Sequence, residues 1–214
     1  MSNTAKDSAS TTGSQLLDKL LANNRVWSEG LSQVKPGYFE QLSKGQSPEI
    51  LWIGCSDSRV CVETLTKADP GQVFVHRNIA NRMIIDDNAS HSVVEFAVRF
   101  LGVKHIVVAG HTHCGGVKGA LSGESLGLLD EWLRPIKQVY EDNKAEIDAL
   151  STAYQRENKL SELNVINSIN NIAKMPSIQD AWAKGKPLAI HGMIFQIETG
   201  LLKDLNVTVS KPQQ

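Results

Sequence analysis

Short apolar runs recur along the chain, and each is bounded by glycine, proline or polar residues. Unbroken runs of about four to eight apolar residues are typical of strands that are buried on both faces of a parallel sheet. The pattern predicts four such strands and an edge strand after them, at residues 50–54, 73–76, 105–110, 188–195 and 205–209.

A helical repeat separates the second and third of these strands. Apolar residues recur there at spacings of three and four, the pattern of one buried helix face: Val93, Val94, Phe96, Ala97, Phe100 and Leu101. Residues 128–175 are also mostly helical in pattern and carry many charges. Because strands alternate with helices, we expect an α/β fold. Its mostly parallel central β-sheet would be flanked by helices, joined by right-handed crossovers and bordered by an antiparallel edge strand.

The N-terminal segment differs from the rest in pattern. Residues 1–14 are rich in serine and threonine and are predicted to be a disordered tail. Residues 15–36 are predicted to be an N-terminal helical arm, and residues 37–214 the α/β domain. The arm has an apolar face, formed by Leu16, Leu17, Leu20, Leu21 and Trp27. That face could pack on a second subunit or cover the chain's own core, and the sequence leaves both open.

The composition narrows the class of protein. At 214 residues and 41% hydrophobic content, the chain suits one compact domain with appendages, or at most two small domains. Lys plus Arg (22) nearly balance Asp plus Glu (23), so no nucleic-acid-binding surface is expected. No apolar run approaches the ~18 residues that would span a membrane. Three cysteines make no disulfide framework and no secretory segment is recognisable, so we expect a reduced, cytoplasmic protein.

Candidate metal ligands follow two of the predicted strands. Cys55 ends the first strand, His111 follows the third, and Cys114 lies in the loop to the next helix. Ligands gather at the carboxyl ends of strands in open α/β sheets, so these residues can lie close together. Zinc favours thiolate and imidazole ligands, and three protein ligands leave a fourth position for water. The sequence therefore predicts a zinc site suited to hydration or hydrolysis.

A carboxylate and a guanidinium accompany the first ligand. Asp57 lies two residues after Cys55, close enough to reach the metal and fill its open position. Arg59, two residues further on, can hold that carboxylate ionised in a bidentate pair. We therefore interpret Asp57 and Arg59 as a catalytic pair with two states. Asp57 would be the fourth metal ligand in a closed state, and in an open state it would accept a hydrogen bond from the attacking hydroxide.

Three motifs resemble those of the β-class carbonic anhydrases. They are Cys-Ser-Asp-Ser-Arg at 55–59, His-Arg-Asn-Ile-Ala-Asn at 76–81 and Gly-His-Thr-His-Cys-Gly-Gly at 110–116. The similarity extends from about Tyr38 to about Leu205. The resemblance implies a lyase that hydrates carbon dioxide reversibly to bicarbonate and a proton. Hydroxide on one Zn²⁺ ion per subunit would be the attacking group, with Cys55, His111 and Cys114 as ligands.

The resemblance also implies a substrate pocket and a quaternary structure. Gln46 would hydrogen-bond the substrate, and Phe74 and Ile79 would form an apolar pocket for carbon dioxide. Phe96, where many relatives carry tyrosine, and Gly115, whose amide opens the next helix, would complete this pocket. Family members pair through swapped N-terminal helices into homodimers, which often join into tetramers, so the arm at 15–36 is expected to have this role.

Other interpretations fit the motifs less well. A phosphatase-like loop needs an arginine six residues after the nucleophilic cysteine, but that position holds Cys61. Thioredoxin-type chemistry needs Cys-x-x-Cys, which is missing. A zinc-stabilised scaffold or bicarbonate sensor with Asp57 always on the metal would not need Arg59. We interpret Cys61 as structural, and we expect His113 to face away from the ligands, with a proton-relay role as its weaker alternative.

Overall fold

The computed structural model describes residues 7–84 and 87–212. The chain divides into two compact units, Met1–Gly45 and Gln46–Gln214. The predicted boundary between the helical arm and the α/β domain lies at residues 36 and 37, nine residues before the observed one.

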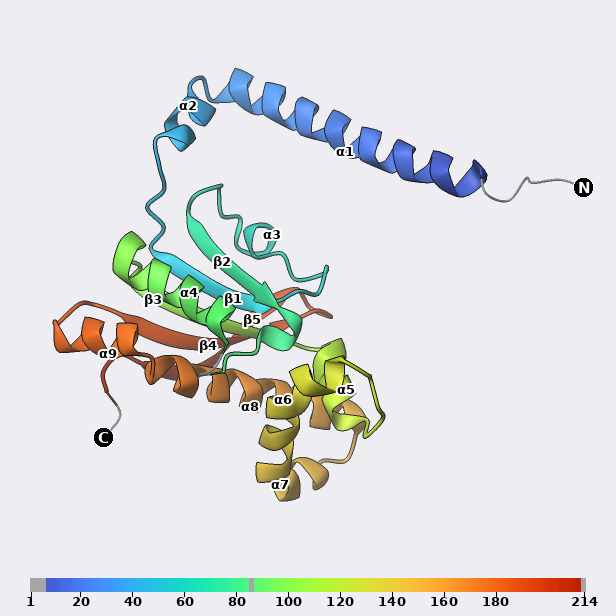
Figure 1. Ribbon diagram of the computed structural model, residues 1–214, viewed down its shortest axis with the longest axis vertical. Coiled ribbons are helices and arrows are strands. Elements are labelled where there is room, and N and C mark those ends of the chain that lie inside the picture. The colour runs from blue at the N-terminus through green and yellow to red at the C-terminus, as the bar shows by residue number, and fades with distance from the viewer. Residues whose placement is uncertain (1–6, 85–86, 213–214) are drawn as a thin grey trace, which may run out of the picture. The chain divides into compact units, whose positions relative to one another are not determined.

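A five-stranded sheet forms the centre of the second unit. The strands run in the order β2-β1-β3-β4-β5, with parallel pairing among the first four and an antiparallel pairing of β5 with β4 (Figure 1). Their bounds are Ile50–Cys55 (β1), Val73–Asn78 (β2), His105–His111 (β3), Ala189–Gln196 (β4) and Leu201–Val209 (β5). The predicted fold class, its five strands and the antiparallel edge strand are therefore confirmed.

Helices fill every connection between the parallel strands, as parallel pairing requires. The short α3 lies between β1 and β2, α4 and a π-helical turn lie between β2 and β3, and five helices lie between β3 and β4. The bounds are Val62–Thr66 (α3), Ile79–Asn81 (η1, a 3₁₀ turn), Asn88–Phe96 (α4), Ala97–Leu101 (η2, the π-helical turn), Gly115–Leu121 (α5), Leu129–Asp142 (α6), Lys144–Asp148 (α7), Ala153–Ala173 (α8) and Pro176–Ala183 (α9).

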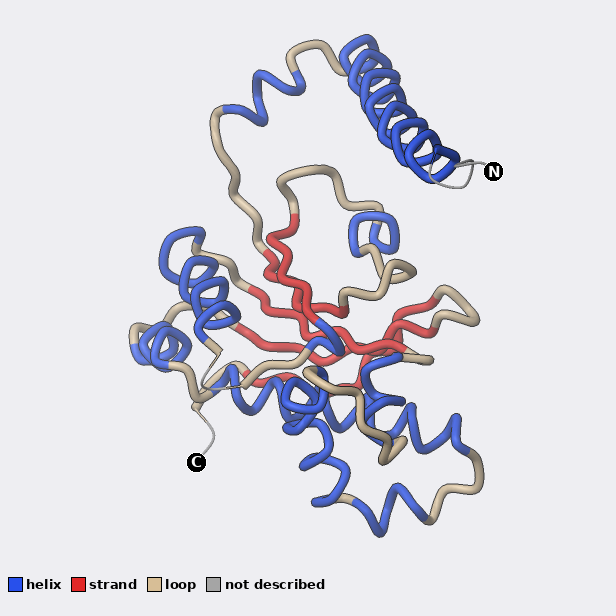
Figure 2. Tube along the Cα trace, turned by 45° about the vertical axis from the view of Figure 1, so that its right-hand side comes forward, coloured by secondary structure: helices blue, strands red, loops and turns tan. Residues whose placement is uncertain are grey.

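The two faces of the sheet are filled differently. Alternate residues of a strand point to opposite faces, so Leu51 and Ile53 of β1 pack with α4, α8 and α9, while Trp52 packs with Val62 of α3 on the other face. In Figures 1 and 2, α4, α8 and α9 lie alongside the sheet. A second core joins α5, α6 and α8 at the carboxyl ends of the strands, where it encloses Cys114.

The register of β1 and β3 decides where the predicted ligands meet. Gly54 pairs with Ala109, so Cys55 and His111 emerge at the same edge of the sheet. Gly110 directly precedes His111 in β3, and a Cβ atom there would meet Ile194 Cδ1 at 2.8 Å and Val165 Cγ2 at 2.9 Å. Only glycine lets α8 and β4 pack so closely against the end of β3.

Two helices make up the first unit, α1 (Asp7–Val34) and α2 (Tyr38–Ser43). The helix begins at Asp7 rather than near residue 15, so residues 7–14, predicted as part of a disordered tail, are helical. Residues 1–6 of that tail lie outside the described residues. Serine and threonine lower helix propensity only modestly, so a segment rich in them can be helical.

The apolar face predicted for the arm is present on α1. Its four leucines, Leu16, Leu17, Leu20 and Leu21, are more than half exposed. Trp27 meets Phe39 of α2 edge-on, with ring centroids 5.3 Å apart. The sequence therefore predicts correctly which residues form this face.

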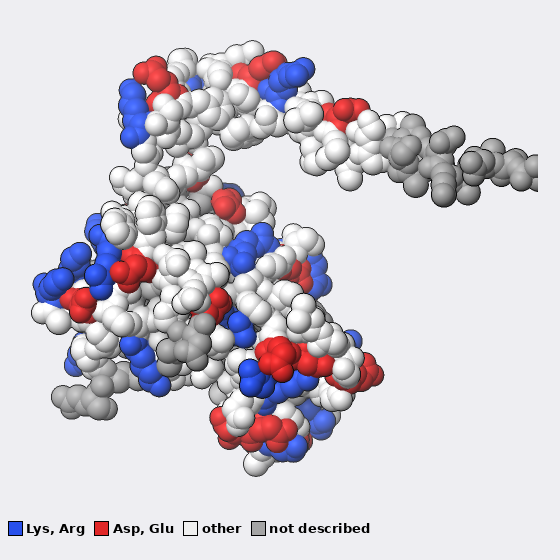
Figure 3. All heavy atoms as spheres, in the orientation of Figure 1, with Lys and Arg blue, Asp and Glu red and all other residues white. Residues whose placement is uncertain are grey.

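Charged groups lie in several clusters on the face seen in Figure 3, where lysine and arginine adjoin aspartate and glutamate, with uncharged surface between the clusters. Over residues 7–84 and 87–212, no helix combines the length and the apolar composition that crossing a membrane requires.

The close packing around Gly110 is testable by substitution. Gly110→Ala would force a methyl group into Ile194 and Val165, and overpacking of this kind costs about 1–3 kcal/mol. We expect denaturant titration to detect this loss in the free energy of unfolding. The matched control is Gly30→Ala in α1, where an added Cβ meets nothing within 4 Å, and it should not destabilise the protein. Equal stability of the Gly110→Ala variant and the unmodified chain would contradict the packing described here.

Candidate metal centre

Three side chains converge at the carboxyl edge of the sheet. Cys55 ends β1, His111 ends β3, and Cys114 is the residue just before α5. Their donor atoms all lie within 4.8 Å of one another, and all three residues are buried. The structure therefore brings together the ligand set predicted from the sequence.

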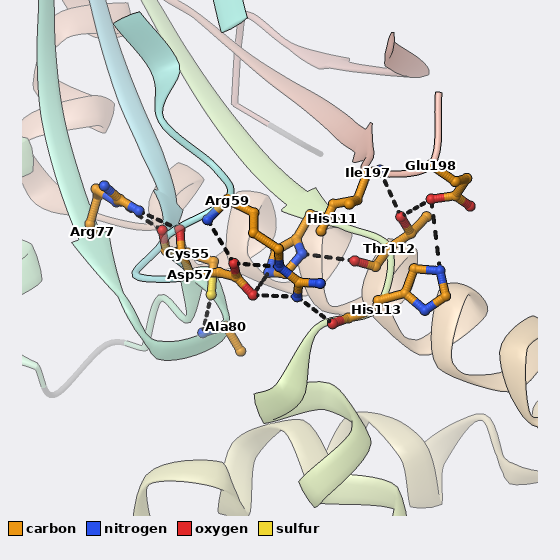
Figure 4. A network of polar contacts seen from close by, with 10 residues as sticks. All are labelled: Cys55, Asp57, Arg59, Arg77, Ala80, His111, Thr112, His113, Ile197 and Glu198. Carbon is orange, nitrogen blue, oxygen red and sulfur yellow. Dashed lines mark hydrogen bonds and ion pairs between the residues drawn. The ribbon is translucent and has the colours of Figure 1, made fainter. Parts of the chain in front are cut away.

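The loop between β3 and α5 turns sharply so that Cys114 can return to the cluster. His113 adopts a left-handed backbone conformation with φ of 55°, and Cys114 leads from it into the helix. Gly116 lets α5 approach the loop after β2, since a Cβ there would lie 3.0 Å from Ala80 Cβ and 3.0 Å from Ile79 Cγ2. His113 itself turns away from the ligands toward Glu198, as expected (Figure 4).

His111 is held as the tautomer that a metal ligand needs. Its Nδ1 lies 2.8 Å from the carbonyl oxygen of Thr112, to which it donates. Its Nε2 is buried without a hydrogen-bond partner among the described residues. An unpaired nitrogen in the interior is costly unless something else satisfies it. Together with two sulfurs, this nitrogen makes a donor set that fits zinc.

The two cysteines form a tightly coupled pair. The neighbouring Cys114 thiol lowers the pKa of Cys55, and the Cys55 sulfur in turn raises the pKa of Cys114. The backbone N–H of Ala80 also donates to Cys55 Sγ, at 3.3 Å. These opposite shifts favour one proton held between the two sulfurs, and a cation bound there would take its place.

Ala80 reaches Cys55 only because its backbone is left-handed, with φ of 61°. Two amide side chains stabilise this turn. Asn164 of α8 donates to the Ala80 carbonyl at 2.9 Å. Asn78 bridges the turn through Arg82, accepting from its N–H at 2.7 Å and donating to its carbonyl at 2.8 Å. The strained turn is therefore fixed from both sides.

Asp57 rests on Arg59 in a bidentate pair. Arg59 Nε donates to Asp57 Oδ1 at 2.9 Å, and Arg59 Nη2 donates to Asp57 Oδ2 at 2.7 Å. The Arg59 backbone N–H adds a third bond, to Asp57 Oδ1 at 2.9 Å. These bonds, led by the guanidinium, hold the pKa of Asp57 well below its usual range. Asp57 Oδ2 is also 3.9 Å from His111 Nε2, so the carboxylate borders the ligand cluster.

Arg77 of β2 fixes the loop that carries Asp57. Its Nε donates to the Cys55 carbonyl at 2.9 Å, and its Nη2 donates to the Asp57 carbonyl at 2.6 Å. Because both carbonyls lie in one turn, a single guanidinium sets the direction of the chain between them (Figure 4).

Comparison with known proteins identifies the family. A family model described as carbonic anhydrase matches residues 50–202. A carbonic anhydrase of Emericella nidulans is 46% identical over 90% of this chain and 85% of its own length. One of two tetrameric β-carbonic anhydrases from Sordaria macrospora superimposes with a TM-score of 0.89 at 41% identity, covering 91% of this chain and 99% of the other. The chain belongs to the β-class carbonic anhydrases.

A solved structure with lower sequence identity supports the same family assignment. The Coccomyxa β-carbonic anhydrase in complex with acetazolamide is 36% identical, with a TM-score of 0.87 over 91% of this chain and 88% of that one. Membership in the β class confirms the class of enzyme that the three motifs predict.

The residues predicted for the substrate pocket of this carbonic anhydrase divide into two groups. Ile79 precedes Ala80, and Gly115 follows Cys114, so both border the ligands. The rings of Phe74 and Phe96 contact each other at a tilt, with centroids 5.8 Å apart, but Phe74 pairs with Leu51, four positions before the level of Cys55. At a rise of about 3.3 Å per residue this is roughly 13 Å away.

Gln46 is the third member of the distant group. It is exposed in the segment before β1, beyond the end of the strand opposite to Cys55. Within one copy of the chain, the fold therefore does not bring Gln46, Phe74 or Phe96 to the metal ligands, and their substrate contacts remain predictions.

Several residues at the edge of the site have no part in the sequence-based prediction. Thr112, Glu198 and Tyr154 form a hydrogen-bonded group next to His111. A signal for Glu198 does exist, because it follows a predicted strand just as Asp57 does, and strand ends meet at one edge. The contributions of Tyr154 and Ala80 depend on helix packing and backbone conformation, for which the sequence carries no comparable signal.

The shared proton of the cysteine pair leads to a prediction about zinc binding. Because the pKa of Cys114 is raised and a thiol must lose its proton to bind a metal, zinc binding near pH 7 should release about one proton from the pair. Zinc affinity should accordingly fall as the pH is lowered. Calorimetry in buffers of different ionisation enthalpy measures this release directly. An affinity independent of pH between about 6 and 8, without proton release, would contradict the assignment.

Proposed function

We propose that this chain catalyses the reversible hydration of carbon dioxide to bicarbonate and a proton, using one zinc ion held by Cys55, His111 and Cys114. The strongest support is the buried Cys–His–Cys set, whose imidazole nitrogen has no partner among the described residues. The β-class membership of the chain supports the same reaction. When bound at such a site, zinc lets water ionise at a pKa of roughly 7, so that hydroxide is available near neutral pH.

Asp57 and Arg59 would orient the attacking group. As long as Arg59 holds both carboxylate oxygens, Asp57 is ionised and stays beside the ligands rather than on the metal. An ionised carboxylate in that place can only accept a hydrogen bond. The attacking group would donate this bond and would then point its free lone pair toward the substrate. Release from Arg59 would let Asp57 become a fourth ligand, which is the closed state.

The pocket for carbon dioxide would combine residues of two copies. Ile79, 41% exposed next to the ligands, offers apolar surface within one copy. Gln46, Phe74 and Phe96 lie toward the amino ends of β1 and β2, so they could reach a site only in a neighbouring subunit. Such a shared pocket would make the oligomer the active form, and a carbonic anhydrase from Sordaria macrospora is tetrameric.

The helical arm would make this oligomer. The exposed leucines of α1 form an apolar face of the kind that pairs with another subunit. We infer a homodimer joined through these helices, with a tetramer as its further assembly. A cytoplasmic location is inferred from the free cysteines, because the two ligand thiols must stay reduced.

The proposed activity is tested by metal analysis together with stopped-flow measurement of carbon dioxide hydration. Cys55→Ser and His111→Ala should lose both zinc and activity, since each removes a ligand. Asp57→Ala should keep zinc but lose about 10–100-fold in rate, the usual cost of removing a group that orients a metal site.

The matched control is Asp180→Ala, which breaks a comparable arginine–aspartate pair, Arg99 with Asp180 at 2.9 Å, away from the ligands. It should leave the rate unchanged. Full hydration activity in metal-free protein would end the proposal, and zinc binding without hydration at any pH would favour a scaffold instead.

The role of the arm is tested by placing charges on its apolar face. The double change Leu17→Asp and Leu21→Asp should dissociate the oligomer and lower the activity, because the burial of each leucine is worth about 1.5–3 kcal/mol. Sedimentation velocity measures the assembly state. Ala22→Asp on the opposite side of α1 is the control, and an unchanged oligomer in the double variant would show that the arm is not the interface.

A further inference from the structure

Thr112, the residue after His111, is fixed at every polar atom. Its backbone N–H donates to the Phe195 carbonyl at 3.0 Å. Its hydroxyl accepts from the Ile197 N–H at 2.9 Å and donates to Glu198 Oε2 at 2.5 Å. Its carbonyl accepts from His111 Nδ1 at 2.8 Å. Because Thr112 is buried, no water replaces these partners.

Glu198, in the turn between β4 and β5, binds two hydroxyl groups at once. Oε2 accepts from Thr112, and Oε1 accepts from the hydroxyl of Tyr154 in α8. The hydrogen bond from Thr112, followed by that from Tyr154, lowers the pKa of Glu198 to about 2. The carboxylate is therefore ionised at neutral pH, and hydrogen bonds to an ionised acceptor are about twice as strong as neutral ones.

The same loop is fixed from its other side. Arg59 Nη2 donates to the His113 carbonyl at 3.2 Å, and the His113 ring packs at a tilt against Tyr154 with centroids 5.1 Å apart. Figure 4 shows Arg59 and Glu198 on opposite sides of the segment 111–113. A left-handed residue such as His113 persists only where its surroundings over-determine it, and these contacts supply that constraint.

We propose that Glu198 is a positioning residue for the metal ligand His111, acting through the hydroxyl and carbonyl of Thr112. The carboxylate fixes the side chain of Thr112, and this fixes the direction of the Thr112 carbonyl. The carbonyl keeps the proton of His111 on Nδ1 and aims Nε2 at the two sulfurs. The inference rests on the proposed role of His111 as a zinc ligand. It adds two residues that the motifs do not include, Tyr154 and Glu198, and it gives a role to Thr112 of the third motif.

Zinc affinity is the property that separates positioning from plain structural support. We would measure the zinc dissociation constant of the full-length chain by chelator competition, and the unfolding free energy of the same variants without metal. Glu198→Ala and Thr112→Val should each weaken zinc binding by about 10–100-fold, the usual cost of losing a group that orients a ligand. The spectrum of the Co²⁺-loaded variants should change as well, since the ligand field follows the angle of the imidazole.

Conservative variants and a matched control sharpen the test. Thr112→Ser keeps the hydroxyl and should restore affinity close to that of the unmodified chain. Tyr154→Phe removes only the second bond to Glu198 and should have a smaller effect than Glu198→Ala. The control is Tyr140→Phe, which removes a similar tyrosine–carboxylate bond, 2.9 Å long, to Asp148 rather than to Glu198. It should not change zinc affinity.

The possible results separate this inference from the proposed function. If the unmodified chain binds zinc and Glu198→Ala binds it equally well, the positioning role is wrong, whatever happens to stability, while the proposed function stands. If Thr112→Ser is as weak as Thr112→Val, the hydroxyl is not the link and the inference is again wrong. If the unmodified chain binds no zinc, both the proposed function and the inference fail.

Discussion

The parallel pairing of β1 with β3 is the constraint on which the rest of the structure depends. It places Cys55 and His111, which are far apart along the chain, at one edge of the sheet. Parallel strands share a direction, so their carboxyl ends meet and the loops that follow them face the same space. Cys114 then needs only the short turn after β3 to complete the ligand set. Gly110 lets α8 and β4 pack tightly against that edge.

Side chains that bind the backbone hold the loops at this edge. Arg77 binds two carbonyls in the loop after β1, Asn164 binds one in the turn after β2, and Glu198 fixes Thr112 in the loop after β3. Irregular backbone near a buried site must satisfy its polar groups somewhere, and here strands and helices on several sides supply the partners. The ligand atoms are therefore held before any cation arrives, as a preorganised metal site requires.

The polar groups of the site fall into two sets: those that could bind a cation, and a carboxylate that is already paired with a cationic side chain. The two sulfurs share a proton that a cation can displace, and His111 offers an unpaired nitrogen. Asp57, by contrast, is already neutralised by Arg59. A carboxylate saturated in this way would not compete for the proposed metal, so a fourth position would stay free for water.

Much of this follows from the sequence itself. Apolar runs and their helical intervals predict the strands and the α/β class, because burial on both faces of a parallel sheet demands such runs. The types and places of Cys55, His111 and Cys114 predict the ligand set, because strand ends must meet. Only the tertiary structure decides that Glu198 holds Thr112 and that Ala80 binds Cys55. Those contacts depend on the packing of separate elements and on a left-handed turn, and neither leaves a periodic signal along the chain.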